Sequence, residues 1–224
     1  MKKYEFTGEE KVIDNHTLHR IRAVRDFGAV KAGDLGGWIE GEDNLSHDGM
    51  AWVGGEALVY GDAWVYSNAW VYGDARVYGN ARVCGNAEVY GNAWVYGDAL
   101  VYGNARVCGN AEVYGNAWVY GDARVYGDAR AYGNAEVYGN AWVCGNAEVY
   151  SNADYAVVHG FGSEQRCTTF FCCKDGFVRA RCGCFYGDLR EFRAKVKETH
   201  GESKMAKEYL MIADLMEMHF AKER

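Results

Sequence analysis

The sequence predicts an all-β solenoid that is closed at each end by a small module. Residues 51–153 run through seventeen consecutive units of six residues, such as Ala-Trp-Val-Tyr-Gly-Asp, without insertion or deletion. Self-similarity at a fixed short period is typical of solenoids, in which each unit buries its apolar side chains only against its neighbours. We expect a β cap over residues 1–46, the solenoid over 47–153 and an α+β module over 154–224.

Each unit is expected to form one short strand and one corner. Alanine opens every unit and valine stands two positions later, with Ala131 as the single exception. Residues two apart on a strand point to the same face, so alanine and valine should face inward. The residue between them and the one that follows should face outward. The Gly-Asp or Gly-Asn pair suits a corner, because glycine accepts positive φ and Asn or Asp tolerates it.

The inward pair favours a narrow three-sided prism, in which three units, or eighteen residues, make one turn. A flattened coil with twelve residues per turn is the alternative. The run Val71-Tyr72-Gly73-Asp74-Ala75-Arg76 resembles the hexapeptide-repeat left-handed β-helix superfamily, whose pattern places a small residue four positions after an aliphatic one. This resemblance, and not the period, implies that the coil is left-handed.

An eighteen-residue turn sorts the outward residues into one column on each face of the prism. With rungs about 4.8 Å apart, Glu88 should pair with Arg106, and Arg130 should lie between Glu112 and Glu148. The first face carries Trp52, Trp70, Glu88, Arg106, Arg124 and Trp142; the second carries Leu58, Arg76, Trp94, Glu112, Arg130 and Glu148; the third carries Trp64, Arg82, Leu100, Trp118 and Glu136. Stacked rings are expected in the tyrosine column of the second face, formed by Tyr60, Tyr78, Tyr96, Tyr114, Tyr132 and Tyr150.

The outward aromatic residues are the candidate binding surface. Six of the seven tryptophans stand between alanine and valine, where we expect them to be exposed. Large apolar groups in registered columns usually mark association surfaces, although stacking that only shields neighbouring backbone is the alternative. The predicted surface consists of Trp52, Trp64, Trp70, Trp94, Trp118, Trp142, Tyr78, Tyr96 and Tyr114.

The N-terminal segment is expected to be a β cap. Strands are predicted at residues 4–6 and 17–25, with a turn at Asp14-Asn15, before residues 38–41 form a first irregular rung. A cap is needed because the open end of a solenoid exposes backbone groups. The two histidines of this segment, His16 and His19, fall on opposite faces of a strand, which argues against a shared metal ion.

The C-terminal segment should contain a hairpin formed by residues 167–173 and 177–182, with Asp175-Gly176 in its turn. Its cysteines raise the alternative of a zinc site. Neighbouring thiols such as Cys172 and Cys173 point to opposite faces of a strand, so we expect buried apolar thiols and no metal. The cysteines concerned are Cys167, Cys172, Cys173, Cys182 and Cys184.

Two helices are expected after the hairpin. The first should begin after Asp188, with Glu191 completing a capping box, and end at Gly201; the second should begin after Ser203. Their apolar stripes are Leu189, Phe192 and Val196, and then Tyr209, Ile212, Ala213, Met216 and Phe220. A basic run on the first helix offers a candidate anion contact at Arg190 and Arg193, and a solvated helix face is the alternative that we favour.

Composition limits the partners. The net charge of −7 disfavours a nucleic-acid clamp. No stretch approaches the apolar length that spans a membrane and no apolar leader opens the chain, so we expect a cytoplasmic location in a bacterial host cell. Three cysteines replace outward tyrosines: Cys108 and Cys144 stand two rungs, about 9.6 Å, apart, and Cys84 lies on another face, so we expect reduced thiols.

The chain offers little for catalysis. The best-known hexapeptide-repeat proteins are acyltransferases that use a histidine near a subunit interface, whereas the array here contains none. His47 and His159 flank the array, and either could approach a neighbouring subunit. A γ-class carbonic anhydrase would need three zinc-binding histidines. We therefore expect no catalytic residue, metal or cofactor, and an acyltransferase with a site between subunits is the alternative.

The terminal modules, with Asp34-Leu-Gly-Gly-Trp38 and Glu191-Phe-Arg-Ala-Lys-Val-Lys-Glu-Thr-His-Gly201, resemble phage and prophage proteins that carry similar arrays and are commonly labelled polymer-forming. The resemblance implies a phage-related context. We predict a non-catalytic scaffold or interaction protein that binds itself, with a trimer favoured, or binds a host protein, for example to block a bacterial defence system. Nucleotide or nucleic-acid binding by the C-terminal module is a further alternative.

Overall fold

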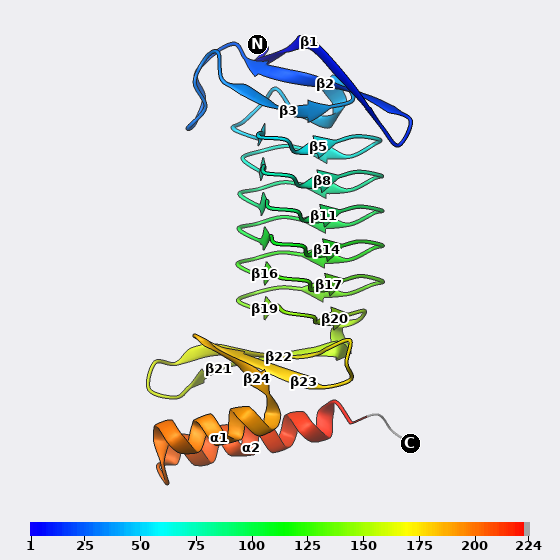
Figure 1. Cartoon of the computed structure of the whole chain (residues 1–224). Helices are drawn as coiled ribbons and strands as arrows, with labels where there is room; N and C mark the ends of the chain where they lie inside the picture. The colour runs from blue at the N-terminus through cyan, green and yellow to red at the C-terminus, as the bar shows by residue number, and fades with distance from the viewer. Residues whose placement is uncertain (222–224) are drawn as a thin grey trace.

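The computed structural model describes residues 1–221 and shows the chain as a column of three parts (Figure 1). An N-terminal β module covers one end of a long solenoid, and a four-stranded sheet with two helices covers the other end. β1 and α2 therefore lie at opposite ends of the column.

The solenoid consists of seventeen two-residue strands arranged in three parallel sheets. The first sheet contains β4 (Trp52–Val53), β7 (Trp70–Val71), β10 (Glu88–Val89), β13 (Arg106–Val107), β16 (Arg124–Val125) and β19 (Trp142–Val143). The second contains β5 (Leu58–Val59), β8 (Arg76–Val77), β11 (Trp94–Val95), β14 (Glu112–Val113), β17 (Arg130–Ala131) and β20 (Glu148–Val149). The third contains β6 (Trp64–Val65), β9 (Arg82–Val83), β12 (Leu100–Val101), β15 (Trp118–Val119) and β18 (Glu136–Val137).

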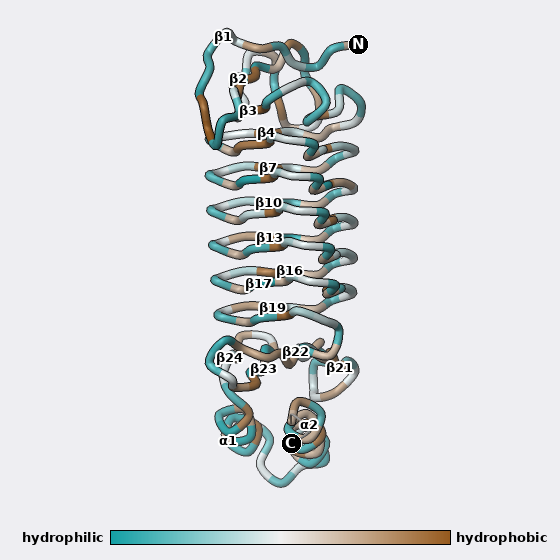
Figure 2. Tube along the Cα trace, turned by 90° about the vertical axis from the view of Figure 1, so that its right-hand side faces the viewer, coloured by the Kyte–Doolittle hydropathy of each residue, from teal (hydrophilic) through white to brown (hydrophobic). Residues whose placement is uncertain are grey.

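The register confirms the eighteen-residue turn. Trp70 pairs with Glu88, Arg76 with Trp94, and every other pairing within the array joins residues the same distance apart. The alternative coil of twelve residues per turn is therefore wrong. Figure 2 shows the rungs stacked at even intervals between the two modules.

The core is the predicted column of small and branched side chains. The alanines and valines of residues 51–149 are at most 1% exposed. At the corners, glycines such as Gly73 adopt a φ of 73°, and a Cβ on Gly73 would lie only 3.0 Å from the backbone nitrogen of Gly91. Both the conformation and the rung below therefore require glycine at this position.

The N-terminal module extends the second sheet. It contains β1 (Tyr4–Ile13), β2 (His16–Ala23), β3 (Leu35–Ile39) and the short 3-10 helix η1 (Glu42–Asn44). β1, β2 and β3 are antiparallel, and β3 then pairs in parallel with β5. The turn at Asp14-Asn15 is confirmed, since both residues have positive φ. The first strand is longer than residues 4–6, and the second ends two residues before the predicted 25.

The C-terminal module is a four-stranded antiparallel sheet in the order β21-β22-β23-β24. Its elements are η2 (Asn152–Asp154), β21 (Tyr155–Phe161), β22 (Arg166–Cys172), β23 (Val178–Cys182), β24 (Phe185–Asp188), α1 (Leu189–His200) and α2 (Lys204–His219). The predicted hairpin is β22–β23, whereas β21 and β24 were not predicted. The capping box of Asp188 and Glu191 and the Ser203 cap are confirmed. Both predicted stripes are buried, with Phe220 only partly so.

The backbone ladder gives the solenoid a chemical direction. The first residue of each strand and the residue after the strand donate their N–H groups to carbonyls of the next rung toward the C-terminus, as from Trp52 N to Ala69 O at 2.9 Å and from Gly54 N to Val71 O at 2.8 Å. The carbonyls of the first rung consequently need donors. The side chain of Asn44 donates to Gly61 O and Ala63 O, both at 2.9 Å, and the buried Lys3 ammonium donates to Ala51 O at 2.7 Å.

At the other end the last rung needs acceptors for its N–H groups. Trp142 N donates to the Thr169 hydroxyl on β22 at 2.9 Å, and Glu136 N donates to the side-chain oxygen of Asn152 at 2.8 Å. Tyr150 N donates to the carboxylate of Asp154 at 3.0 Å. The two modules thus satisfy backbone groups of opposite polarity, which an open end would leave unpaired.

We expect Asn44→Asp to destabilise the fold strongly. Asn44 is 3% exposed, and its amide group donates two hydrogen bonds while its oxygen accepts from Glu40 N and Gly41 N. A carboxylate keeps the two accepted bonds but turns an acceptor toward two carbonyls, at a cost of about 2–6 kcal/mol since each lost buried donor costs roughly 1–3 kcal/mol. Urea unfolding followed by circular dichroism measures the change.

The matched control is Asn134→Asp at an exposed corner. Asn134 accepts a bond from Asn116, and its own amide donates to no residue within 1–221. Its substitution should alter the unfolding free energy by no more than about 0.5 kcal/mol. Equal unfolding midpoints for the two variants would contradict the assigned role of Asn44.

Candidate binding faces of the solenoid

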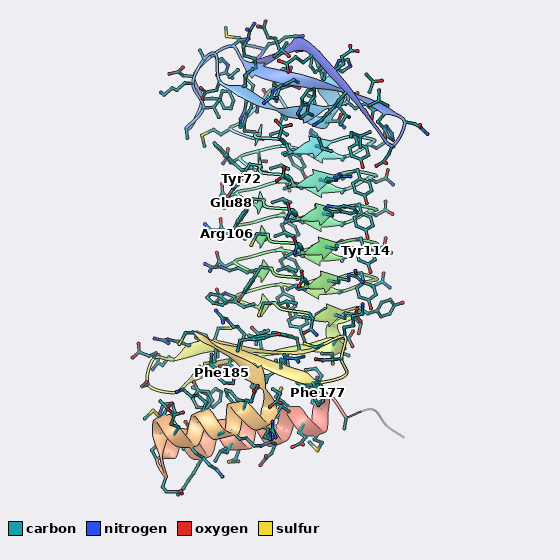
Figure 3. The ribbon with its side chains drawn as sticks, viewed as in Figure 1. Tyr72, Glu88, Arg106, Tyr114, Phe177 and Phe185 are labelled. Carbon is teal, nitrogen blue, oxygen red and sulfur yellow. The ribbon has the colours of Figure 1, made fainter. Side chains whose placement is uncertain are left out.

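The tyrosine column of the second face is confirmed. Neighbouring rings from Tyr60 to Tyr132 have centroids 4.9–5.1 Å apart and planes within 11° of parallel. The last ring, Tyr150, instead meets Tyr132 edge-on at 65°. Figure 3 shows Tyr114 within this column, beside the strand arrows of the second sheet. The stack places flat apolar surfaces side by side along the whole shaft.

The environment raises the pKa values of the tyrosine columns. Burial is the main cause at Tyr96, where Glu112 accepts a hydrogen bond from the phenol and adds to the rise in pKa. At Tyr66 and Tyr90, hydrogen bonds with Cys84 and Cys108 come first and burial second, and the pKa rises to about 12. All of these effects favour the neutral phenol.

The corners carry a second ladder, which the sequence analysis did not identify. Asn68 donates to Asn86, Asn86 to Asn104, and Asn104 to Asp122, at 3.0–3.2 Å. Each donation runs eighteen residues forward. An ionised aspartate has no N–H to donate, so the chain of bonds stops at Asp122. The choice between Asn and Asp in each unit therefore sets the length of each amide ladder.

The prediction that all six array tryptophans are exposed is wrong for Trp52. Its side chain is 4% exposed because the N-terminal module folds over it, with the Phe27 ring 5.4 Å away and edge-on. Trp70 and Trp142 are half-buried, next to the N-terminal and C-terminal modules. Only Trp64, Trp94 and Trp118, at 40%, 38% and 44%, are exposed. The period could not reveal which rungs the modules cover.

Cations and ion pairs occupy the first two faces. Arg76 lies over the Trp94 ring at 5.1 Å, and Arg124 lies over Trp142 at 4.7 Å. Glu88 and Arg106 pair at 3.4 Å, as predicted (Figure 3). Arg130 lies between Glu112 and Glu148 in the sheet register, as predicted; its guanidinium pairs at 3.2 Å with Glu112, and among the described residues no ion pair joins it to Glu148.

The third face differs because its apolar groups have no such cover. The third face consists of Trp64, Arg82, Leu100, Trp118 and Glu136 on the strands together with Tyr66, Tyr102, Tyr120 and Tyr138 beside them. Trp64 stacks on Tyr66 at 4.0 Å, and the other three rings stack on one another. Within residues 1–221 no cation lies over Trp64 or Trp118, and Tyr138 is 49% exposed.

The cysteines form no disulfide in the described chain. Cys144 was expected to face outward, but it is 2% exposed beneath the C-terminal module, and burial raises the pKa of its thiol. Residues 1–221 contain no group of three or more His, Cys, Asp or Glu side chains that could hold a metal ion. His16 instead contacts the Glu40 carboxylate at 2.9 Å.

The two flanking histidines lie at opposite ends of the shaft. His47 stacks on Tyr4 at 4.2 Å, and its Nδ1 accepts a hydrogen bond from Lys3 N at 3.3 Å; burial lowers the pKa of this imidazole. His159 is exposed on β21, in a cleft of about 350 Å³ that also includes Trp142 and Arg166. The two imidazoles therefore cannot act together in one chain.

Arg193, a candidate anion contact, already pairs with carboxylates of the chain. Its guanidinium pairs with Asp214 of α2 at 2.8 Å and also with Glu217, so carboxylates already occupy it. Arg190 is exposed on the same helix and lines a cleft with Phe177 and Leu189. The ion pairs join α1 to α2, a contact that the linear sequence did not indicate.

These features define a β-solenoid repeat protein. Five overlapping stretches of the array match the YdcK Beta solenoid repeat, at residues 69–85, 81–97, 93–109, 105–121 and 117–133. The matched region is less than half of the chain and includes neither terminal module, so it supports a repeat solenoid without assigning the whole chain to that family. No curated protein matches the chain. No helix in the described part is long and apolar enough to cross a membrane.

The raised pKa values predict a loss of stability in alkali. The unfolded chain ionises its tyrosines near pH 10, whereas Tyr66 and Tyr90 ionise at about 12 in the folded state. Between these values the unfolded state has lost protons that the folded state still holds, so stability is intact below about pH 10 and falls as the pH rises. Tyrosinate absorbance, titrated in buffer and in urea, measures the difference. Superimposable curves would show that the columns do not protect their phenols.

Proposed function

We propose that the protein is a non-catalytic scaffold that associates laterally through the third face. The observation that supports this most directly is the contrast among the faces: ion pairs and arginine–tryptophan contacts occupy the first and second, whereas among the described residues no cation lies over the exposed Trp64 and Trp118. Exposed apolar groups of this kind are typical of association surfaces.

The closed ends favour side-by-side contact. At each terminal rung, side chains of the adjoining module pair with exposed-end backbone groups: Asn44 and Lys3 at one end, Thr169 and Asn152 at the other. End-to-end strand pairing between copies would have to break these bonds. The partner we propose is a second copy of the chain, with a trimer favoured. The alternative, which the resemblance to phage proteins suggests, is a protein of the bacterial host.

The size of the third face indicates a weak contact. Five strands about 4.8 Å apart span roughly 20 Å, and four extended residues along each side of the prism span about 13 Å. The flat area of one face is therefore roughly 260 Å², without the added surface of protruding side chains. A stable interface buries about 800 Å² per partner. Each contact should therefore be transient, and tight assembly would need several contacts at once.

The test replaces the exposed indoles of the third face. The double variant Trp64→Ser/Trp118→Ser should stay monomeric, whereas the mass of the wild-type protein should rise with concentration, because the variant lacks the uncovered apolar groups. Analytical ultracentrifugation over a wide concentration range measures the mass, and circular dichroism checks that both proteins are folded.

The matched control is Trp94→Ser on the second face. Trp94 has nearly the same exposure as Trp118, but Arg76 covers its ring. This variant should assemble like the wild type. A wild-type chain that is monomeric at every concentration, or a double variant that assembles like the wild type, would overturn self-association through the third face.

A further inference from the structure

A cleft of about 670 Å³ lies where the loop between β2 and β3 passes over the first face. Val30 and Asp34 line it from the loop, Leu35 from the start of β3, and Trp70, Tyr72 and Glu88 from the solenoid. Figure 3 shows Tyr72 and Glu88 on the side of the shaft where this loop descends in Figure 1. The volume falls within the range of small-molecule sites.

The cleft lies at a rung that has no outward side chain at the tyrosine position, in a column where Cys108 and Cys144 also replace tyrosine. Gly54 stands at the position that holds Tyr72 one rung below and Tyr90 two rungs below. Its backbone keeps the same ladder, since Gly54 N donates to Val71 O at 2.8 Å. Gly54 is not among the positive-φ glycines, and a Cβ there would lie 3.4 Å or more from its neighbours. Neither backbone conformation nor crowding at Cβ therefore requires glycine.

The missing ring leaves a stacking face of Tyr72 without an aromatic partner. Tyr72 stacks on Tyr90 at 5.0 Å with planes 4° apart, and this is its one ring contact among the described residues. Its opposite face points toward the rung of Gly54. The free space next to Tyr72 is consequently suited to a planar group of about the thickness of a tyrosine ring.

Polar groups surround the position of the missing ring. The Trp52 side chain is 4% exposed and lines the cleft, and its indole nitrogen carries the one N–H of the ring. That nitrogen lies 3.4 Å from the position that a Cβ on Gly54 would take. Asp34 on the loop accepts one backbone bond through Oδ2, from Lys31 N. Glu88 receives only long contacts, from Arg106 at 3.4 Å and from the Tyr72 hydroxyl at 3.5 Å.

We propose that this cleft binds a planar heteroaromatic ring that carries an N–H donor pair beside a carbonyl oxygen, as in guanine. The ring stacks on the free face of Tyr72 in place of the absent side chain. Its carbonyl accepts from the Trp52 indole N–H, and its donor pair meets a carboxylate of Asp34 or Glu88.

The charged residues at the cleft restrict the chemical class of the ligand further. Asp34 and Glu88 are both acidic, and Arg106 is the cation that contacts Glu88. A phosphate on the ligand would therefore face net negative charge, so a free nucleoside or base suits the cleft better than a nucleotide. A guanidinium ion could stack and meet the carboxylates, but it offers no acceptor for the Trp52 N–H.

The experiment uses the full-length protein and three probes. Calorimetry should detect saturable binding of guanosine, roughly tenfold weaker binding of inosine, which lacks the amino donor, and no binding of arginine amide. The indole N–H signal of Trp52, identified among the seven indole signals by its loss in Trp52→Phe, should shift when guanosine binds.

Gly54→Tyr is the decisive variant, because it fills the space with the ring that the column lacks. Trp64 and Tyr66, two residues apart like Trp52 and Gly54, stack at 4.0 Å, so the fold already contains such a pair. We expect the variant to lose guanosine binding and to keep or raise its melting temperature.

Asp34→Asn provides a second test if the larger substitution fails to fold, and it should weaken guanosine binding severalfold. The proposal is overturned if the wild type binds no guanosine, if it binds arginine amide in preference, or if a folded Gly54→Tyr protein binds guanosine like the wild type. These outcomes are independent of the oligomeric state and leave the proposed scaffold function untouched.

Discussion

The direction of the backbone ladder is the constraint on which the rest of this structure depends. Within the array, the first residue of each strand and the residue that follows the strand donate their N–H groups to carbonyls of the next rung, as from Trp52 and Gly54 to Ala69 and Val71. The corresponding carbonyls of the first rung therefore have no preceding rung to donate to them, and the corresponding N–H groups of the last rung have no following rung to accept from them. Lys3 and Asn44 supply donors at the first rung, and Thr169, Asn152 and Asp154 supply acceptors at the last. The two modules are chemically distinct because one supplies hydrogen-bond donors and the other supplies acceptors.

The same register determines what the outer surface can contain. Residues eighteen apart stand about 4.8 Å from each other, a spacing that suits stacked rings and amide ladders but brings like charges together. Arg106 and Arg124 are direct neighbours in the first sheet. The conflict is resolved by their turning apart, since Arg106 pairs with Glu88 on one side and Arg124 lies over Trp142 on the other. The third face lacks such an arrangement around its tryptophans, which is why it stands out as the apolar one.

Periodicity made the shaft predictable and the modules only partly so. The inward Ala and Val residues, the eighteen-residue register, the tyrosine column and the caps at Asp188 and Ser203 all follow from local pattern and turn chemistry. The burial of Trp52 and Cys144 and the pairing of Arg193 depend on how a non-repeating segment folds onto the array or onto another helix. A prediction from residues eighteen positions apart treats every rung alike, so it cannot identify the rungs that the terminal modules cover. The strands β21 and β24 were missed for a related reason, since each is defined by its partner in the sheet and not by its own pattern.

In a repeat protein the informative residues are those that depart from the repeat without a structural need. Ala131 replaces valine inside the prism and stays fully buried, so it is a packing variant of the core. Ser67 takes the place of a corner glycine at a φ of 62°, and nothing in the structure explains it. Gly54 differs from both, because an ordinary side chain would meet neither strain nor close contact at its Cβ, and its absence opens a cleft beside a free ring face. Since the neighbouring rungs show that a tyrosine at this position stabilises the column by stacking, the glycine forgoes that stabilisation. A residue that lowers the stability of the fold and opens a cavity is best explained by selection for binding and not by selection for folding.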